Sequence, residues 1–187
     1  LALWNNPVLA PQIKAALDNR DIDLFGMTYH PTYSTPEGYQ NWVNYALGRN
    51  PDTRFFIGTP WVSDPGSFTL ADYEAAYNAV QTGTTQPILD TLRSEHPGVD
   101  FYEIPYGMAA VELRRLWEDG TLTANGDVTA LIGPAADSIF TDAHGHPGDI
   151  LQDLGTWLWL GAIYGVDRMY YDTEPPFTTD LISIAQA

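Results

Sequence analysis

Helical patterns alternate with short apolar runs along this chain, and this alternation most constrains its fold. Apolar residues recur at helical spacing over residues 7–19, 34–51, 70–96, 108–120 and 147–164, with a break or kink expected near 83–87. The runs 21–30, 53–61 and 99–107 have the length and composition of buried strands. Helices that alternate with buried strands predict a parallel sheet covered on both faces. We therefore expect one three-layer α/β/α domain over residues 1–187, with a mostly parallel sheet.

The last long helical pattern, residues 147–164, is apolar nearly all round, which predicts a helix buried on most sides. Its apolar run 155–166 is about half of the ~20 residues that a membrane span needs, so no membrane span is expected. The tail 173–187 is expected to form one more helix. A loop follows the helical pattern 108–120, and the sequence patterns assign neither a helix nor a strand to the segments GDVTALIG and ADSIF after it.

The charge balance narrows the class of partner. Eight Lys and Arg oppose 24 Asp and Glu, giving a net charge of −16, so the chain offers no basic face for nucleic acid. An acidic surface suits an extracellular or periplasmic setting. The absence of cysteine excludes disulfides and thiolate chemistry. The chain begins with Leu1 and no signal peptide, so we expect a processed chain or a piece of a longer one.

Chemically useful side chains follow the predicted strands. The strand ends carry TYHP (28–31), TPW (59–61) and PYG (105–107), and the loop TDAHGHPGD follows at 141–149. Ligands bind at the carboxyl ends of the strands in open α/β sheets. We therefore expect these four segments to meet at one edge of the sheet.

The pair His144 and His146 allows three interpretations. With His30 or Asp142 as a third ligand, it could bind zinc in a metal-dependent hydrolase. Alternatively, Asp142 could orient His146, or His144, as the acid–base half of a hydrolase. Finally, these polar residues could only cap the helix that starts near Pro147, with Asp149 at its positive end.

The wider layout resembles the latter part of an SGNH (GDSL-like) hydrolase over roughly residues 8–166. DIDLFGMTYHP is similar to the third conserved block of that family, and NYALGRNPDTRFFIGTPW and HPGVDFYEIPYG are similar to its next helix and strands. FTDAHGHPGDILQDLG looks like the last block, where Asp and His precede the final helix. The resemblance implies a flavodoxin-like α/β/α fold, a serine hydrolase activity on carboxylic esters and no cofactor. It assigns the general base to His146 and its orienting partner to Asp142.

The chain departs from that family in three places. The family spaces its Asp and His by three residues, whereas Asp142 lies two from His144 and four from His146, so His144 stays possible as the base. The oxyanion-donating Asn has no counterpart, and Tyr29 or His30 stands in its place. The Gly-Asp-Ser nucleophile block and the first strand are missing. We therefore expect the serine to lie on an upstream segment, either in the same protein or in a second chain.

Aromatic residues suggest the substrate contacts. Trp61 and Tyr106 lie near strand ends, where they could line an apolar cleft or stack on a sugar ring, whereas Trp42, Trp157 and Trp159 follow helical patterns and are expected in the core. We expect a small-molecule or carbohydrate ester substrate, such as an acetyl ester. Two rivals stay open: the metal-dependent hydrolase, and a non-catalytic binding or structural module with the same fold.

Overall fold

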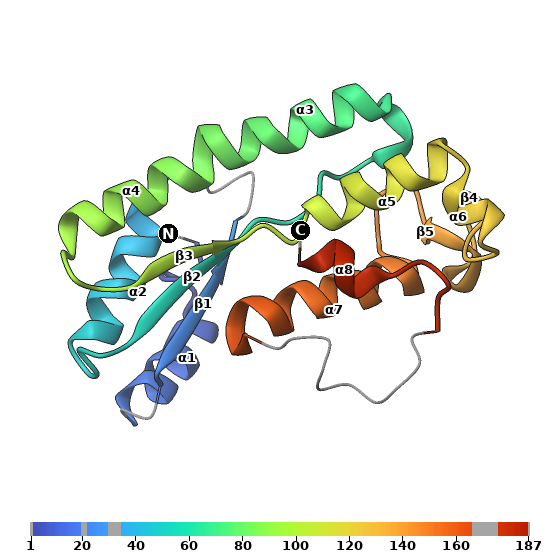
Figure 1. Cartoon of the computed structure of the whole chain (residues 1–187). Coiled ribbons are helices and arrows are strands. Elements are labelled where there is room, and N and C mark those ends of the chain that lie inside the picture. Colours follow the sequence, from blue (N-terminus) through green and yellow to red (C-terminus); the bar gives the residue numbers. More distant parts are fainter. Residues whose placement is uncertain (1, 20–21, 30–34, 166–175, 187) are drawn as a thin grey trace. The chain divides into compact units, whose positions relative to one another are not determined.

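The computed structural model describes residues 2–19, 22–29, 35–165 and 176–186 (Figure 1). These residues form two compact units. The first unit comprises Leu1–Thr59 and Ala79–Ile104, and the second comprises Pro60–Asn78 and Pro105–Ala187. Both units combine helices with parallel strands. The mixed α/β class is therefore confirmed, and the arrangement is compatible with a three-layer α/β/α fold.

The first unit is built on a three-stranded parallel sheet in the order β1-β2-β3. The strands are β1 (Leu24–Thr28), β2 (Arg54–Gly58) and β3 (Phe101–Ile104), and the helices are α1 (Leu9–Asp18), α2 (Glu37–Leu47) and α4 (Gln86–Glu95). All six elements fall within stretches that the sequence patterns predict as helices or strands.

Aromatic residues hold one face of this sheet to its helices. Phe25, Phe55 and Phe101 occupy matching positions on the three strands. Their neighbouring ring centroids lie 6.3 and 5.2 Å apart. One hydrophobic cluster joins these rings to α1, α2 and α4, where Trp42 is among the buried residues. Burying large rings in one continuous cluster supplies most of the driving force for this unit.

The helical stretch 70–95 does not break where the sequence predicts a break. α3 (Leu70–Val80) passes through a π-helical segment, Gln81–Thr85, into α4. Pro87, which has no backbone N–H to donate, lies at the start of α4, directly after the π-helical segment. At the predicted interruption, the helix therefore widens into a π-helical turn and then continues. Such turns often occur at functional positions.

The second unit packs helices around a two-stranded parallel sheet. Its strands are β4 (Ala130–Ile132) and β5 (Ser138–Phe140), and its helices besides α3 are α5 (Met108–Glu118), α6 (Thr121–Ala124), α7 (Asp149–Tyr164) and α8 (Leu181–Ala185). Three residues each of GDVTALIG and ADSIF, to which the sequence patterns assign no element, pair as these strands. Tyr73, Tyr77, Phe140 and Leu154 are fully buried in the core of this unit.

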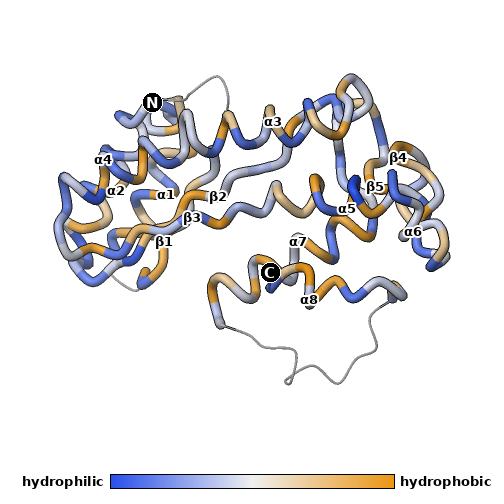
Figure 2. The backbone as a smooth tube through the Cα atoms, turned by 45° about the horizontal axis from the view of Figure 1, so that its top comes forward, coloured by the Kyte–Doolittle hydropathy of each residue, from blue (hydrophilic) through white to orange (hydrophobic). Residues whose placement is uncertain are grey.

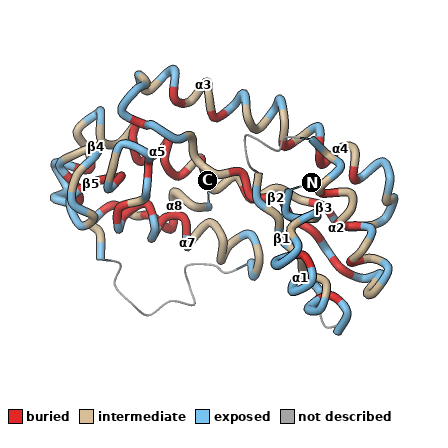
Figure 3. Tube along the Cα trace, turned by 180° about the vertical axis from the view of Figure 1, so that it is seen from behind, coloured by how far each residue is buried: buried red, intermediate tan, exposed pale blue. Residues whose placement is uncertain are grey.

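The prediction that α7 is buried on most sides is wrong for its C-terminal half. Hydrophobic residues continue along the helix (Figure 2), but the buried ones, such as Leu151 and Leu154, lie in its first two turns (Figure 3). Trp159 and Leu160 are only partly buried, and Tyr164 is 73% exposed. The second half of α7 therefore presents apolar side chains that no core covers.

Three further expectations relate to the whole chain. No helix within the described ranges is long and apolar enough to cross a membrane. The expectation of one domain that lacks its N-terminal strand stays a prediction. The described residues cluster into two compact units, but this does not decide whether the units belong to one domain. The predicted meeting of all four polar segments at one sheet edge is also untested, because β5 and the loop after it belong to the smaller sheet of the second unit.

Candidate active site

Residues 141–148, which we call the histidine loop, leave β5 and return to α7 as a closed turn. The Thr141 backbone N–H donates to the His146 carbonyl at 2.7 Å, and the Gly148 N–H donates to the Ile139 carbonyl at 2.8 Å. Gly145 has a φ of +92°, in the left-handed region that favours glycine. The sequence HGHPG therefore folds into a fixed loop on the rigid end of a strand.

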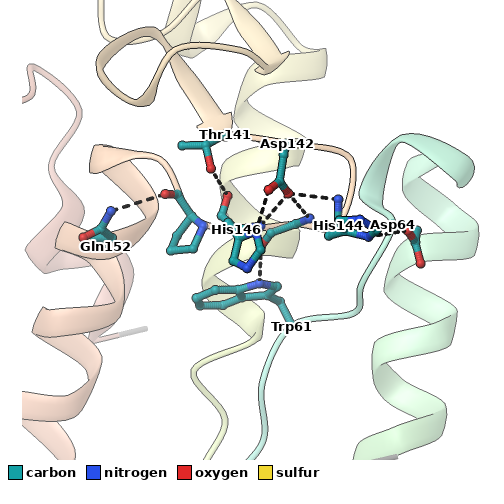
Figure 4. A network of polar contacts seen from close by, with 9 residues as sticks. Trp61, Asp64, Thr141, Asp142, His144, His146 and Gln152 are labelled. Carbon is teal, nitrogen blue, oxygen red and sulfur yellow. Dashed lines mark hydrogen bonds and ion pairs between the residues drawn. The ribbon is translucent and has the colours of Figure 1, made fainter.

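Asp142 organises this loop with both of its carboxylate oxygens (Figure 4). Its Oδ1 accepts backbone N–H bonds from His144, Gly145 and His146, at 2.9, 3.1 and 3.2 Å. Its Oδ2 lies 2.5 Å from Nδ1 of the His146 ring. The hydrogen bond from the His146 ring, together with the smaller effect of the backbone N–H donors of His146 and His144, lowers the pKa of Asp142 from 3.8 to about 2. The carboxylate is therefore ionised at neutral pH and holds the ring from one side.

His146 has the arrangement of a general base. Because Asp142 accepts at Nδ1, the hydrogen-bond network assigns the ring proton to Nδ1 and leaves the lone pair on Nε2. Nε2 has no hydrogen-bond partner in the described ranges, and the side chain is 71% exposed. A carboxylate on one ring nitrogen and a free lone pair on the other is the orientation that a proton-accepting histidine needs.

The interpretation of these residues as caps of α7 is wrong. The N-cap of α7 is Gly148, and no side chain makes a capping hydrogen bond there. Both carboxylate oxygens of Asp142 accept hydrogen bonds from within the histidine loop instead. Asp149 does lie in the first turn of α7, where its charge suits the helix dipole.

His144 pairs with a different carboxylate from the one that pairs with His146. Its Nδ1 lies 3.8 Å from Oδ1 of Asp64, and the two side chains are 82% and 58% exposed. Asp64 has a φ of +56°, which is rare for a residue other than glycine. The two imidazole rings therefore pair with different carboxylates, and only His146 shares one with the loop backbone.

Metal binding finds no support in this arrangement. In the described part of the chain, no group of three or more His, Cys, Asp or Glu side chains is placed to hold a metal ion. His30, one of the third ligands considered, lies outside the described residues. Tyr29 is described and lies in the first unit, where its N–H donates to Gly58. The suggested oxyanion role of Tyr29 and His30 stays a prediction.

Trp61 and Tyr106, the two aromatic residues expected near strand ends, lie beside the histidine loop. The Trp61 indole Nε1 donates to the Gly145 carbonyl at 2.9 Å, which fixes the indole against the histidine loop (Figure 4). The Tyr106 ring meets Trp61 edge-on, with centroids 5.5 Å apart, and lies 5.4 Å from the Trp159 ring. Trp61, Tyr106 just before α5, and Trp159 on α7 therefore form one continuous aromatic wall.

This wall bounds a cavity of about 380 Å³. Gln152 lines the cavity and donates from Nε2 to the Pro147 carbonyl at 3.3 Å, so the cavity adjoins the histidine loop. The lining residues are Trp61, Tyr106, Leu151, Gln152, Gly155, Thr156, Trp159, Leu160, Ile163 and Tyr164. The assignment of Trp159 to the core is therefore wrong, because it lines a cavity and is only partly buried.

A buried arginine fixes the segment that carries Trp61 and Asp64. Arg114 on α5 is 4% exposed and donates to the Pro65 and Phe68 carbonyls at 2.8 and 2.5 Å. Pro65 in turn packs against the histidine loop: a Cβ on Gly145 would lie 3.2 Å from the Pro65 ring. Arg114 is thus a positioning residue that the sequence pattern hid, since it falls on an ordinary helical face.

No described serine is paired with His146. The Ser138 hydroxyl donates to the Pro134 and Phe140 carbonyls, and the Ser183 hydroxyl donates to Asp180. Comparison with family models, curated proteins and solved structures gave no match. The resemblance to SGNH hydrolases therefore rests on the sequence segments quoted above.

Proposed function

We propose that the histidine loop is the acid–base half of a serine hydrolase of SGNH type that cleaves carboxylic esters. The observation that carries this proposal is the Asp142–His146 pair, with 2.5 Å between Oδ2 and Nδ1 and an unpartnered Nε2 within the described residues. A structural role alone would need only the backbone bonds of Asp142. The additional bond to the ring orients an exposed imidazole that would otherwise rotate freely.

In this proposal, His146 works through its Nε2 atom. It accepts the proton of a serine hydroxyl as the serine oxygen forms a bond to the ester carbonyl carbon. When the tetrahedral intermediate collapses, the carbon–oxygen bond to the alcohol breaks and His146 returns the proton to that oxygen. Water, deprotonated by the same nitrogen, then releases the acid and restores the serine. Asp142 stays ionised throughout and stabilises the charged imidazole.

The serine comes, in this proposal, from a segment outside the printed sequence, either upstream in the same protein or in a second chain. The described serines support this, since none of them bonds to His146. The ester could be a small molecule or an acetylated carbohydrate, and an extracellular or periplasmic location fits the net charge of −16.

The test uses the protein from its natural source with every polypeptide that co-purifies. Hydrolysis of p-nitrophenyl acetate is compared for the natural sequence, His146→Ala and the matched control His144→Ala. Loss of a general base lowers turnover by about 10²–10⁴-fold, so His146→Ala should fall in that range. His144→Ala removes only an exposed pair worth up to about 1 kcal/mol, so turnover should change by less than about fivefold.

Two results would overturn the proposal. Equal loss in both variants, together with loss on adding a chelator, would favour the metal-dependent alternative. Full activity of His146→Ala, or no activity in any preparation that binds ligand normally, would favour a different base or a non-catalytic binding module.

A further inference from the structure

The cavity beside the histidine loop has the size and composition of a ligand pocket for an uncharged group. Its volume of about 380 Å³ lies within the roughly 300–1,000 Å³ of small-molecule sites. None of its ten lining residues carries a charge. A chain with a net charge of −16 also repels anions. The cavity therefore disfavours carboxylates and phosphates, and its lining offers no carboxylate to pair with a cation.

The polar groups of the cavity are few and mostly engaged. Gln152 donates to the Pro147 carbonyl, and the Thr156 hydroxyl donates to the Gln152 carbonyl. The indole N–H of Trp61 is bonded to Gly145. The Tyr106 hydroxyl, in contrast, has no hydrogen-bond partner among the described residues, and burial raises its pKa, which keeps it a donor. The Tyr106 hydroxyl can thus donate a hydrogen bond to a ligand oxygen.

A sugar ring fits such a cavity poorly. A hydroxyl that turns toward the aromatic wall and finds no partner there loses its bonds to water, which weakens binding. An aromatic ring or a short acyl chain carries no such cost, and it gains contact with Trp61, Tyr106 and Trp159.

The floor of the cavity is a glycine on α7. Gly155 lines the cavity, and a Cβ built on it would meet no atom within 4 Å. Gly161, two turns later on the same helix, also has open space around its Cβ but does not line the cavity. The chain therefore offers a substitution that fills the cavity and a matched one that does not.

We infer that this cavity binds the apolar aryl or acyl group of an uncharged ligand, with the Tyr106 hydroxyl donating to an oxygen of that ligand. If the proposed function holds, this group is part of the ester substrate, so the site would prefer aryl or longer acyl esters to sugar acetates. The binding itself does not depend on His146.

The test is a fluorescence titration with N-phenyl-1-naphthylamine, an uncharged aromatic probe that brightens in apolar surroundings. The natural sequence should bind the probe, Gly155→Leu should bind it at least about tenfold more weakly, and Gly161→Leu should bind it as the natural sequence does. Gly155→Ala, which adds one methyl group, keeps the test decisive if Gly155→Leu does not fold; it should weaken binding by a smaller factor. Circular dichroism establishes that each variant is folded.

Probe binding that is unchanged in folded Gly155→Leu, or equally weakened in Gly161→Leu, would overturn the inference. Tight binding of xylobiose with no binding of the probe would overturn it in favour of a sugar. His146→Ala separates the two proposals: loss of ester turnover with intact probe binding supports both. Full turnover with intact probe binding refutes the catalytic proposal alone, and weakened binding in folded Gly155→Leu still supports the cavity.

Discussion

Replacement of Arg114 by methionine should destabilise the second unit and loosen the candidate site together. The guanidinium is 4% exposed and connects α5 to the segment that carries Trp61 and Asp64. Methionine keeps the apolar stem of the side chain but removes every donor. The substitution thus isolates the polar contribution of this residue from its packing.

The magnitude follows from the partners of Arg114. The Pro65 and Phe68 carbonyls would each lose a donor, at about 1–3 kcal/mol apiece. The pair with Glu118, four residues along the helix and at the surface, adds about 0.3–0.5 kcal/mol. Relief from burying the guanidinium charge offsets part of this sum. We expect a net loss of about 3 kcal/mol in the free energy of unfolding, a large share of the 5–15 kcal/mol of an ordinary domain.

Urea unfolding followed by circular dichroism measures this loss, and the neighbouring residue supplies the control. Arg115 is 42% exposed and pairs with Glu112 and Glu74 at the surface, so Arg115→Met should cost less than about 1 kcal/mol. Arg114→Met should also weaken probe binding to the aromatic cavity, because the segment that carries Trp61 loses its hydrogen bonds to α5 at Pro65 and Phe68. A loss below about 1 kcal/mol for Arg114→Met, or equal losses for both variants, would refute this reasoning.

Three further predictions concern single positions. Gly26→Ala should lose about 1–3 kcal/mol, because its Cβ would lie 2.0 Å from the Phe56 ring, whereas Gly83→Ala meets nothing and should lose none; thermal unfolding compares them, and equal losses would contradict the packing argument. The pKa of Asp142 is lowered to about 2, so its contribution to loop stability is present above about pH 4 and is lost as the pH falls through 2; a carboxyl NMR titration with a midpoint near 3.8 would refute this. Burial raises the pKa of Tyr39 to about 12, so its contribution is complete below pH 10 and is lost as the pH rises through 12; burial also raises the pKa of Tyr73, so ultraviolet titration should find late-ionising tyrosines, and Tyr39→Phe should remove the component near pH 12.

Periodicity predicts the elements that pack in a regular way. The strand-like runs around Phe25, Phe55 and Phe101 form the three parallel strands of the first unit, and the helical patterns end within a few residues of α1, α2 and α5. Each of these elements buries one apolar face, which leaves a strong local signal in the sequence. The pairing of Asp142 with His146 also follows from spacing and chemistry, since four residues in a closed loop bring the two side chains together.

The remaining features depend on contacts that no local pattern encodes. β4 and β5 are three residues each, too short for alternation to identify them. Trp159 and Gly155 lie on a helix that is apolar all round, so the sequence does not say which side faces a cavity. Arg114 meets its carbonyl partners 46 and 49 residues away. The sequence did carry one indication of the cavity. The second half of α7 has apolar residues on more sides than a half-exposed helix can bury in a core.

The most direct test of the central claim, that His146 activates a serine, is labelling of the natural protein with a fluorophosphonate, read by intact mass of every polypeptide. The account predicts one labelled serine, outside residues 1–187, whose labelling is abolished by His146→Ala and retained in His144→Ala. Labelling that survives His146→Ala, or no labelling of any polypeptide in a preparation that hydrolyses esters, would contradict it.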